Sequence, residues 1–104
     1  MIEWAYIDGR DPEARPPLTL ARMNVWAKLP RRLNQIVGQI KHGHRVLVIE
    51  RERCGYEGRE MARIRRGFVS GWVPASWLSE EREEPVGEWY HPGRVRKRKR
   101  KRRR

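Results

Sequence analysis

The chain has 104 residues, among them 25 Lys and Arg, 13 Asp and Glu and one cysteine, and its formal net charge is +12. A single cysteine cannot form an internal disulfide, so the composition excludes a small secreted domain held together by disulfides. The first seventeen residues carry four acidic side chains and lack the apolar run of a signal peptide, and no later segment is apolar for long enough to span a bilayer. We therefore expect one small, soluble, cytoplasmic domain.

Residues 1–20 combine two aromatic side chains, Trp4 and Tyr6, with a charged stretch that contains three prolines between positions 12 and 17. Proline removes a backbone donor and cannot continue a helix. The pattern predicts an irregular N-terminal arm. Its residues Trp4, Tyr6 and Ile7 either pack against the domain or form an exposed docking patch.

Residues 21–78 show short β-type segments at regular spacing, which predict five strands, over residues 24–26, 35–40, 45–50, 61–66 and 68–73. The apolar run within 45–50 is the strongest of these signals, and we expect it to form the central strand. In 61–66, Ala62 and Ile64 alternate with Met61, Arg63 and Arg65, as in a half-buried strand. A short helical turn is expected over residues 74–78. Five short strands without an amphipathic helix indicate an all-β class and a small β-barrel.

This region resembles the bacterial Src-homology-3 (SH3) domain family over residues 21–78. The opening MNVWAKLPRRLNQIVGQIKHGHRVLVIE is similar to the family's first three strands, and GWVPASWL, from Gly71 to Leu78, is similar to its closing strand and one-turn helix. The resemblance implies an SH3-like β-barrel of about five strands. It implies a fold more directly than an activity, because small barrels host many functions.

Peptide-binding members of that family build a groove from two aromatics near the start, a Trp before the fourth strand, and the Pro and final aromatic of the closing motif. The Trp position falls near Arg59 here, and the two starting positions are not aromatic. A polyproline ligand needs parallel aromatic walls, so half of that groove is absent. The remaining candidate partner surface consists of Met23, Val25, Trp72, Pro74 and Trp77.

Residues 79–93 read as an acidic and aromatic linker, with five Glu and one Arg between Ser79 and Glu88. This acidic stretch is either a solvated linker or a segment that folds back on the basic tail and competes with nucleic acid. Trp89 and Tyr90 follow it, next to the tail. They are expected either to stack on unpaired bases, as in single-strand binders, or to pack back on the barrel.

The last eleven residues contain ten basic side chains and no carboxylate, whereas the other 93 residues carry 15 Lys and Arg against 13 Asp and Glu, about +2 in net charge. Such a block of charge does not fold alone and gains free energy by meeting a polyanion, which makes RNA or DNA the expected partner. A solubilising terminus and a nuclear-localisation-type signal are the alternatives. The candidate nucleic-acid-binding cations are Arg94, Arg96, Lys97, Arg98, Lys99, Arg100, Lys101, Arg102, Arg103 and Arg104.

Arginines on the predicted strands could extend this basic surface, but neighbouring glutamates dilute it. We expect an ordinary face of mixed charge there. The arginines concerned are Arg51, Arg53, Arg63, Arg65 and Arg66.

The sequence contains no pattern typical of an enzyme. His42 and His44 lie in a turn without the four ligands of a structural zinc site, and Cys54 has no predicted base partner, so we expect no metal and no cofactor. The leading expectation is a non-enzymatic nucleic-acid-binding protein anchored by its basic tail, within a ribosome or another nucleoprotein particle. The alternative is an SH3-type protein-interaction module that uses the surface around Trp72, Pro74 and Trp77.

Overall fold

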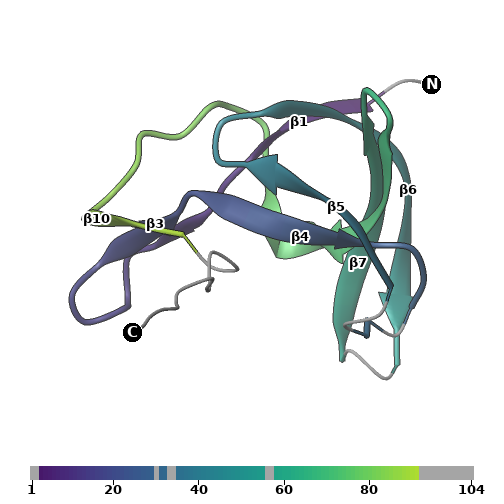
Figure 1. The fold of residues 1–104 in the computed structure, drawn as a ribbon, viewed down its shortest axis with the longest axis horizontal. Helices are drawn as coiled ribbons and strands as arrows, with labels where there is room; N and C mark the ends of the chain where they lie inside the picture. The colour runs from purple at the N-terminus through teal and green to yellow at the C-terminus, as the bar shows by residue number, and fades with distance from the viewer. Residues whose placement is uncertain (1–2, 30, 33–34, 56–57, 92–104) are drawn as a thin grey trace, which may run out of the picture.

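The structure, a computed structural model, describes residues 3–29, 31–32, 35–55 and 58–91 (Figure 1). Apart from 3₁₀ turns, the regular elements among these residues are all strands, which confirms the predicted all-β class. They are β1 (Glu3–Ile7), β2 (Arg10–Asp11), β3 (Leu18–Leu20), β4 (Arg22–Trp26), β5 (Ile36–Lys41), β6 (Arg45–Cys54), β7 (Arg59–Arg66), β8 (Val69–Pro74), η2 (Ala75–Trp77), β9 (Leu78–Ser79) and β10 (Glu88–Tyr90).

Seven of these strands form one antiparallel sheet, in the order β5-β4-β8-β7-β6-β1-β9. The five strands expected between residues 21 and 78 are β4 to β8, and they are consecutive in the sheet. A small barrel of about five strands was expected; the sheet that contains these strands has seven, and among the described residues no pairing between its edge strands β5 and β9 closes it. The strand over residues 45–50, expected to be central, is the start of β6 and lies beside the middle strand β7.

The prediction of an irregular arm over residues 1–20 is wrong for β1, which pairs with β6 on one side and with β9 on the other. The short sequence EWAYI alternates: Ala5 and Ile7 are buried, whereas Trp4 is exposed and Tyr6 is half-buried. This period of two is the physical reason for the strand, since it lets one face of β1 join the core. The prolines that suggested an arm lie beyond β1.

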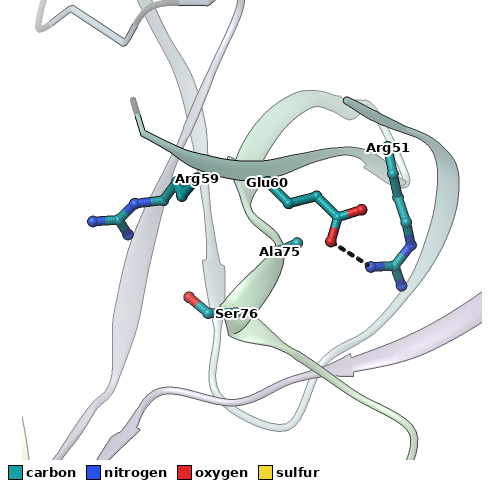
Figure 2. Close-up of a pocket in the computed structure, with 5 residues that line it drawn as sticks. All are labelled: Arg51, Arg59, Glu60, Ala75 and Ser76. Atoms are coloured by element: carbon teal, nitrogen blue, oxygen red, sulfur yellow. Dashed lines mark ion pairs between the residues drawn. The ribbon is translucent and has the colours of Figure 1, made fainter. Parts of the chain in front are cut away.

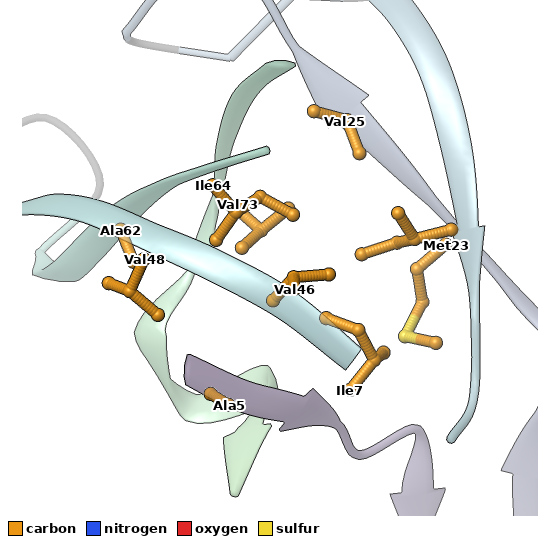
Figure 3. Packing of buried hydrophobic residues seen from close by; sticks show 10 residues of the cluster. Ala5, Ile7, Met23, Val25, Val46, Val48, Ala62, Ile64 and Val73 are labelled. Atoms are coloured by element: carbon orange, nitrogen blue, oxygen red, sulfur yellow. The ribbon is translucent and has the colours of Figure 1, made fainter. Parts of the chain in front are cut away.

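The core lies on one face of the large sheet and consists of aliphatic side chains and one methionine, contributed by six strands (Figure 3). On β7, Ala62 and Ile64 point into it, as the alternation predicted. Met61 was expected on the other face, yet it is also fully buried, where β8 ends at its pairing partner Pro74. Burial of each large aliphatic side chain contributes roughly 1.5–3 kcal/mol. The cluster comprises Ala5, Ile7, Met23, Val25, Ile40, Val46, Val48, Ala62, Ile64 and Val73.

A second sheet of three short strands, in the order β10-β3-β2, brings the C-terminal region back to the N-terminal one. β10 lies parallel to β3, and the backbone N–H of Ala21 donates to the carbonyl oxygen of Tyr90 at 2.7 Å. We call residues 80–90 the C-terminal strap. Figure 1 shows it crossing from the large sheet to β3. The expected linker over residues 79–93 is therefore, up to Tyr90, a segment docked on the domain.

Two contacts fix the strap near its middle. The side chain of Thr19 is fully buried, and its Oγ1 both donates to the carbonyl oxygen of Val86 and accepts from the Val86 N–H. Gly87 has a φ of 59°, and a Cβ there would collide with the carbonyl oxygen of Pro17. Glycine is required at this position by both its conformation and its close approach to β3.

Candidate nucleic-acid interface

The ten basic residues of the tail, residues 94–104, lie outside the described residues, but the aromatic pair that precedes them is described. Trp89 and Tyr90 belong to β10, and each keeps about half of its surface in solvent. The Trp89 ring lies edge-on to the imidazole of His42, with 5.9 Å between ring centroids. Both aromatic rings of β10 thus stay accessible although the strap is docked on the domain.

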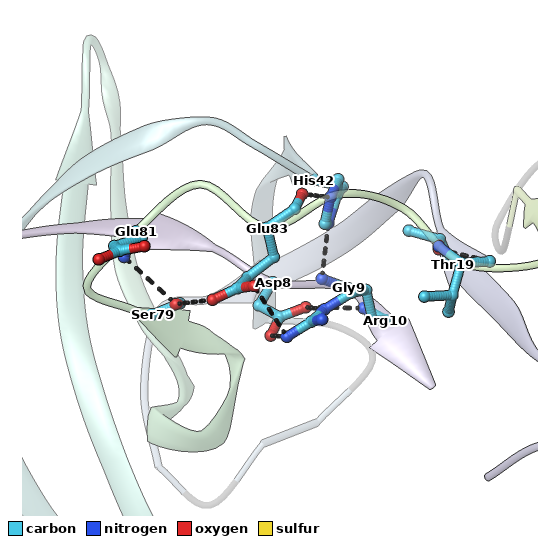
Figure 4. Close-up of polar contacts among 9 residues, drawn as sticks. Asp8, Gly9, Arg10, Thr19, His42, Ser79, Glu81 and Glu83 are labelled. Atoms are coloured by element: carbon cyan, nitrogen blue, oxygen red, sulfur yellow. Dashed lines mark hydrogen bonds and ion pairs between the residues drawn. The ribbon is translucent and has the colours of Figure 1, made fainter. Parts of the chain in front are cut away.

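His42 holds the strap to the N-terminal region (Figure 4). Its Nδ1 accepts a hydrogen bond from the Gly9 N–H at 3.0 Å, so its Nε2 carries the proton that is donated to the carbonyl oxygen of Glu83 at 2.8 Å. The Glu83 carboxylate contacts Arg10 at 3.3 Å and accepts from the Ser79 hydroxyl at 2.9 Å. Both ring nitrogens of His42 therefore serve the fold.

A second group of aromatic and basic side chains lies on the face of the large sheet that points away from the core. The register places Trp4 of β1 opposite Leu47 of β6, and Leu47 opposite Arg65 of β7. These three residues, with Arg45, Arg66 and Gly67, line a cavity of about 300 Å³ that we call the Trp4 pocket. Three strands contribute to this pocket, which explains why no single stretch of the sequence indicated it.

The Trp4 pocket is strongly cationic. Within the described part of the chain, no carboxylate lies within ion-pair distance of Arg45, Arg65 or Arg66. The Cζ of Arg45 lies over the Trp4 ring, 4.4 Å from its centroid, and Arg66 donates one N–H to the Arg45 carbonyl oxygen at 3.1 Å. Their guanidinium groups retain further N–H donors that could bind an anion.

Two other arginines of the sheet, Arg51 and Arg63, form ion pairs, so the prediction of a face of mixed charge holds for that part of it. Arg63 pairs with Glu50 at 2.8 Å. Arg51 pairs with Glu3 at 2.7 Å and approaches Glu60 at 3.8 Å. A larger cavity of about 460 Å³ is lined by Arg51 and Glu60, which form an ion pair with each other (Figure 2). Because a carboxylate offsets the charge of Arg51, this cavity is a weaker candidate for binding a polyanion.

Further cations lie toward the turn between β5 and β6, where Glu83 and Glu84 of the strap line the surface together with His44 and Arg82. The pKa of His44 is lowered, first by its partial burial and then by the positive charges of Arg66, Lys41 and Arg82. The Cζ of Arg82, from the strap, lies 5.9 Å from the centroid of the Tyr6 ring. We call the residues of this surface the basic face: Lys41, Arg45, Arg65, Arg66 and Arg82.

Phe68 lies at the turn between β7 and β8, where its side chain is fully exposed. The preceding Gly67 lines the Trp4 pocket and adopts a φ of 60°, the left-handed conformation that a tight turn requires. The sequence pattern placed Phe68 at the start of a strand, so its exposure was not predicted. The ring is in full contact with water and is therefore accessible to a ligand.

Three members of the candidate partner surface are buried. Met23 and Val25 point into the core from β4, and Pro74 is buried at the end of β8, so their assignment to an exposed surface is wrong. The resemblance aligned these residues with the groove positions of the family. The alternation along β4, however, points the side chains of Met23 and Val25 into the core.

Trp72 and Trp77, the other two members, are half-buried, and they join a residue that sequence reasoning missed. Trp26 is the cross-strand partner of Trp72, and its ring centroid lies 6.3 Å from that of Trp77. The guanidinium of Arg31 lies over the Trp26 ring at 4.7 Å. This tryptophan cluster is thus assembled from β4, β8 and η2.

Within the described ranges, no three His, Cys, Asp or Glu residues are grouped so that they could hold a metal ion. The single cysteine, Cys54, is buried at the end of β6. No helix among the described residues is long and apolar enough to cross a membrane.

Comparisons with known proteins assign no family to the chain. No protein-family model matches the sequence, and no curated protein or solved structure matches it either. The resemblance to bacterial SH3 domains therefore remains an expectation from the sequence motifs.

Proposed function

We propose that this protein is a non-enzymatic nucleic-acid-binding protein that holds RNA or DNA electrostatically, through the basic tail and the basic face together. The observation that carries the proposal is the Trp4 pocket, where Arg45, Arg65 and Arg66 surround an exposed indole without a carboxylate partner in the described part of the chain. Unpaired guanidinium groups beside an aromatic ring suit phosphates and bases.

The two basic regions would contribute differently to binding. The ten cations of residues 94–104 would neutralise phosphates and release counterions, which gives affinity with little dependence on sequence. The basic face is carried by paired strands and by the docked strap, so its cations have defined positions. The tail would supply most of the affinity, and the basic face would fix the orientation of the bound strand. A ribosome or another nucleoprotein particle is a setting in which both would act.

A salt titration tests the proposal. Affinity for single-stranded RNA, duplex RNA and duplex DNA is measured for the full chain, for a truncation after Gly93, and for the triple variant Arg45→Gln, Arg65→Gln, Arg66→Gln. Each phosphate contact contributes about −0.7 to −0.9 to the slope of log K against log salt, so the triple variant should lose roughly 2 to 3 units of slope and the truncation more.

The matched control is a second triple variant, Arg51→Gln, Arg53→Gln, Arg63→Gln. It removes the same formal charge from the sheet, but two of its three arginines already pair with glutamates. It should therefore reduce the slope less than the first triple variant. Binding to all three nucleic acids that is absent or insensitive to salt would contradict the proposal.

We also propose that β4 to β8, with η2, correspond to the strands and one-turn helix of an SH3-like unit. Three observations support this. The closing motif GWVPASWL coincides with the end of β8, with η2 and with the start of β9. The five strands also occur in the expected order along the chain, and they are neighbours in the sheet. In this proposal β1 and β9 are additions to the edge of the unit.

A second candidate function is an SH3-type interaction module that captures a protein partner on the tryptophan cluster. The contact between Trp26 and Trp77 and the pairing of Trp26 with Trp72 support it, since clustered, partly exposed tryptophans are frequent at protein interfaces. Truncation after Gly93 separates the two functions. It should weaken nucleic-acid binding and leave capture of a protein partner intact.

A further inference from the structure

We propose that the Trp4 pocket binds an unpaired nucleobase, so that the protein prefers single-stranded nucleic acid to duplex. This inference rests on the proposed function. It adds the class of nucleic acid and the place where a base is bound, and it assigns that role to residues outside the tail.

The pocket has the surfaces that a base requires. Trp4 is 49% exposed, and Leu47 beside it adds an aliphatic surface. Arg45 lies over the Trp4 ring and adds a planar cation, and both indole and guanidinium groups stack on nucleobases. A base that enters the cavity therefore meets an aromatic ring, an aliphatic side chain and a guanidinium.

The charges around the pocket select a polyanion. Arg65 and Arg66 line the cavity next to the turn between β7 and β8, and neither contacts a carboxylate of the described residues. A base in the pocket would bring the phosphates on either side of it close to these guanidinium groups. An acidic peptide would satisfy the charges too, but a carboxylate has no aromatic face to stack on Trp4, and this difference favours nucleic acid.

The size of the cavity selects an unpaired base. At about 300 Å³ it is at the lower end of the range of small-molecule sites, roughly 300–1,000 Å³, and it does not have room for a duplex. The faces of bases in a duplex are covered by their neighbours in the stack, and only their edges reach the grooves. A base can enter this pocket only if it is single-stranded or flipped out.

Phe68 adds a second exposed aromatic ring, on the turn that contains the pocket residue Gly67. It follows Gly67, which lines the pocket, and its ring is fully exposed. The base next to the bound one would reach this ring, because successive bases of a single strand commonly stack on separate aromatic side chains.

The experiment measures binding of the full chain to a twelve-nucleotide oligo(U), to oligo(dT) of equal length and to a duplex of the same length at one salt concentration. The variants are Trp4→Ala, Trp4→Phe and Phe68→Ala. Val37→Ala is the control, because Val37 is exposed to the same degree as Trp4, at 48%, and lies on β5, outside the pocket.

We expect Trp4→Ala to weaken binding of the single strands by roughly 5- to 150-fold, as base–aromatic stacking of about 1–3 kcal/mol implies, and to change duplex binding by less than twofold. Trp4→Phe keeps an aromatic ring and should retain most of the affinity. Phe68→Ala should weaken single-strand binding without affecting folding, because its ring is fully exposed. Oligo(U) should quench more tryptophan fluorescence in the natural protein than in Trp4→Phe.

Several results would overturn the inference. If Trp4→Ala and Phe68→Ala bind single strands normally while the truncation after Gly93 abolishes binding, the proposed function stands and the base site fails. The inference also fails if duplex binds as tightly as single strands, or if polyglutamate binds with the same dependence on Trp4. If the full chain binds no nucleic acid, both proposals fail. Should Trp4→Ala unfold the protein, Phe68→Ala and the fluorescence comparison decide the question.

Discussion

Thr19 and Val86 exchange two hydrogen bonds across 67 residues of sequence, with the Thr19 hydroxyl donating at 2.7 Å and accepting at 2.6 Å. Thr19 is the only buried polar residue among those that the structure describes. Its hydroxyl takes the place of a backbone partner for Val86, directly before β10 pairs with β3. This side chain is one of several groups that connect the C-terminal strap to the N-terminal region.

Replacing this hydroxyl should release the strap. Thr19→Val leaves two backbone groups of Val86 without a partner, and we expect the free energy of unfolding to fall by about 1–3 kcal/mol. The amide of Ala21 is a local reporter, because it donates to the Tyr90 carbonyl oxygen, and its hydrogen exchange should accelerate. Thr19→Ser keeps the hydroxyl and should cost under about 1 kcal/mol. Unchanged exchange at Ala21 in Thr19→Val would contradict this role.

Gly71 is expected to be intolerant of any side chain. A Cβ there would collide with the carbonyl oxygen of Trp26 and lie 2.9 Å from a methyl group of Val25, so β4 and β8 would have to separate. We expect Gly71→Ala to lower the free energy of unfolding by about 3 kcal/mol or more, measured by urea denaturation. Gly55→Ala is the control, since a Cβ at Gly55 meets no atom of the described residues within 4 Å and should change stability by less than about 0.5 kcal/mol. Equal stability of the two variants would refute the close approach.

The ion pair of Asp8 and Arg10 should make stability depend on pH in acid. Two side-chain hydrogen bonds from Arg10, each at 2.9 Å, lower the pKa of Asp8 below its usual 3.8, against the opposing effect of burial. The ionised carboxylate is favoured in the folded state. Its contribution to the free energy of unfolding is therefore complete above pH 3.8 and is lost as the pH falls below 3.8 through the lower pKa of the folded state. Asp8→Asn should be less stable at pH 6 and approach the natural protein at pH 2; a constant difference would disprove the linkage.

His44 should make the free energy of unfolding depend on pH in a second range, at higher pH than Asp8. Burial, followed by repulsion from Arg66, Lys41 and Arg82, lowers its pKa below 6.5, so the folded state favours the neutral imidazole. Stability is then complete above pH 6.5 and decreases as the pH falls below 6.5 through the folded pKa, because the unfolded chain binds the proton more tightly. His44→Gln should remove this slope. Chemical denaturation at half-unit intervals between pH 5 and 8 measures it, and an unchanged slope in His44→Gln would assign it to another group.

Under the proposed function, binding of nucleic acid should raise the pKa of His44, whereas folding lowers it. Bound phosphates would offset the charges of Arg66, Lys41 and Arg82, so the pKa of His44 should rise in the complex and a proton should be taken up. Affinity should then increase as the pH falls from 7.5 to 5.5. A flat profile in His44→Gln, beside a sloped one in the natural protein, would identify the group. Identical profiles would contradict its participation.

The strands between residues 36 and 74 could be predicted from the sequence because their signals are local. Alternation placed Ala62 and Ile64 in the core, and the turns at Gly43 and Gly67 have the positive φ that such short connections need. The 3₁₀ turn after Pro74 was likewise recognisable from the closing motif. Each of these features depends on residues that are neighbours in the sequence.

The features that were missed depend on pairing over long distances. β10 has only three residues, and it is a strand because β3 lies beside it, 70 residues earlier in the chain. The Trp4 pocket needs β1, β6 and β7 in register, and the neutralisation of Arg51 and Arg63 by glutamates follows from the same pairing. Composition counted these charges correctly but could not tell which of them remain unpaired.

The parallel pairing of β3 with β10 also has a consequence for how the molecule folds. Bringing β10 beside β3 closes the long stretch of chain between them, and this costs conformational entropy that the few contacts of a three-residue strand do not offset alone. The strap should therefore dock only after the large sheet has formed. The strap is then a late element of folding. The ten cations of the tail follow the strap in the sequence, so the chain that leads to them is held at a defined position on the domain only after the strap has docked. An incompletely folded molecule carries the same ten charges but does not hold their attachment point in place.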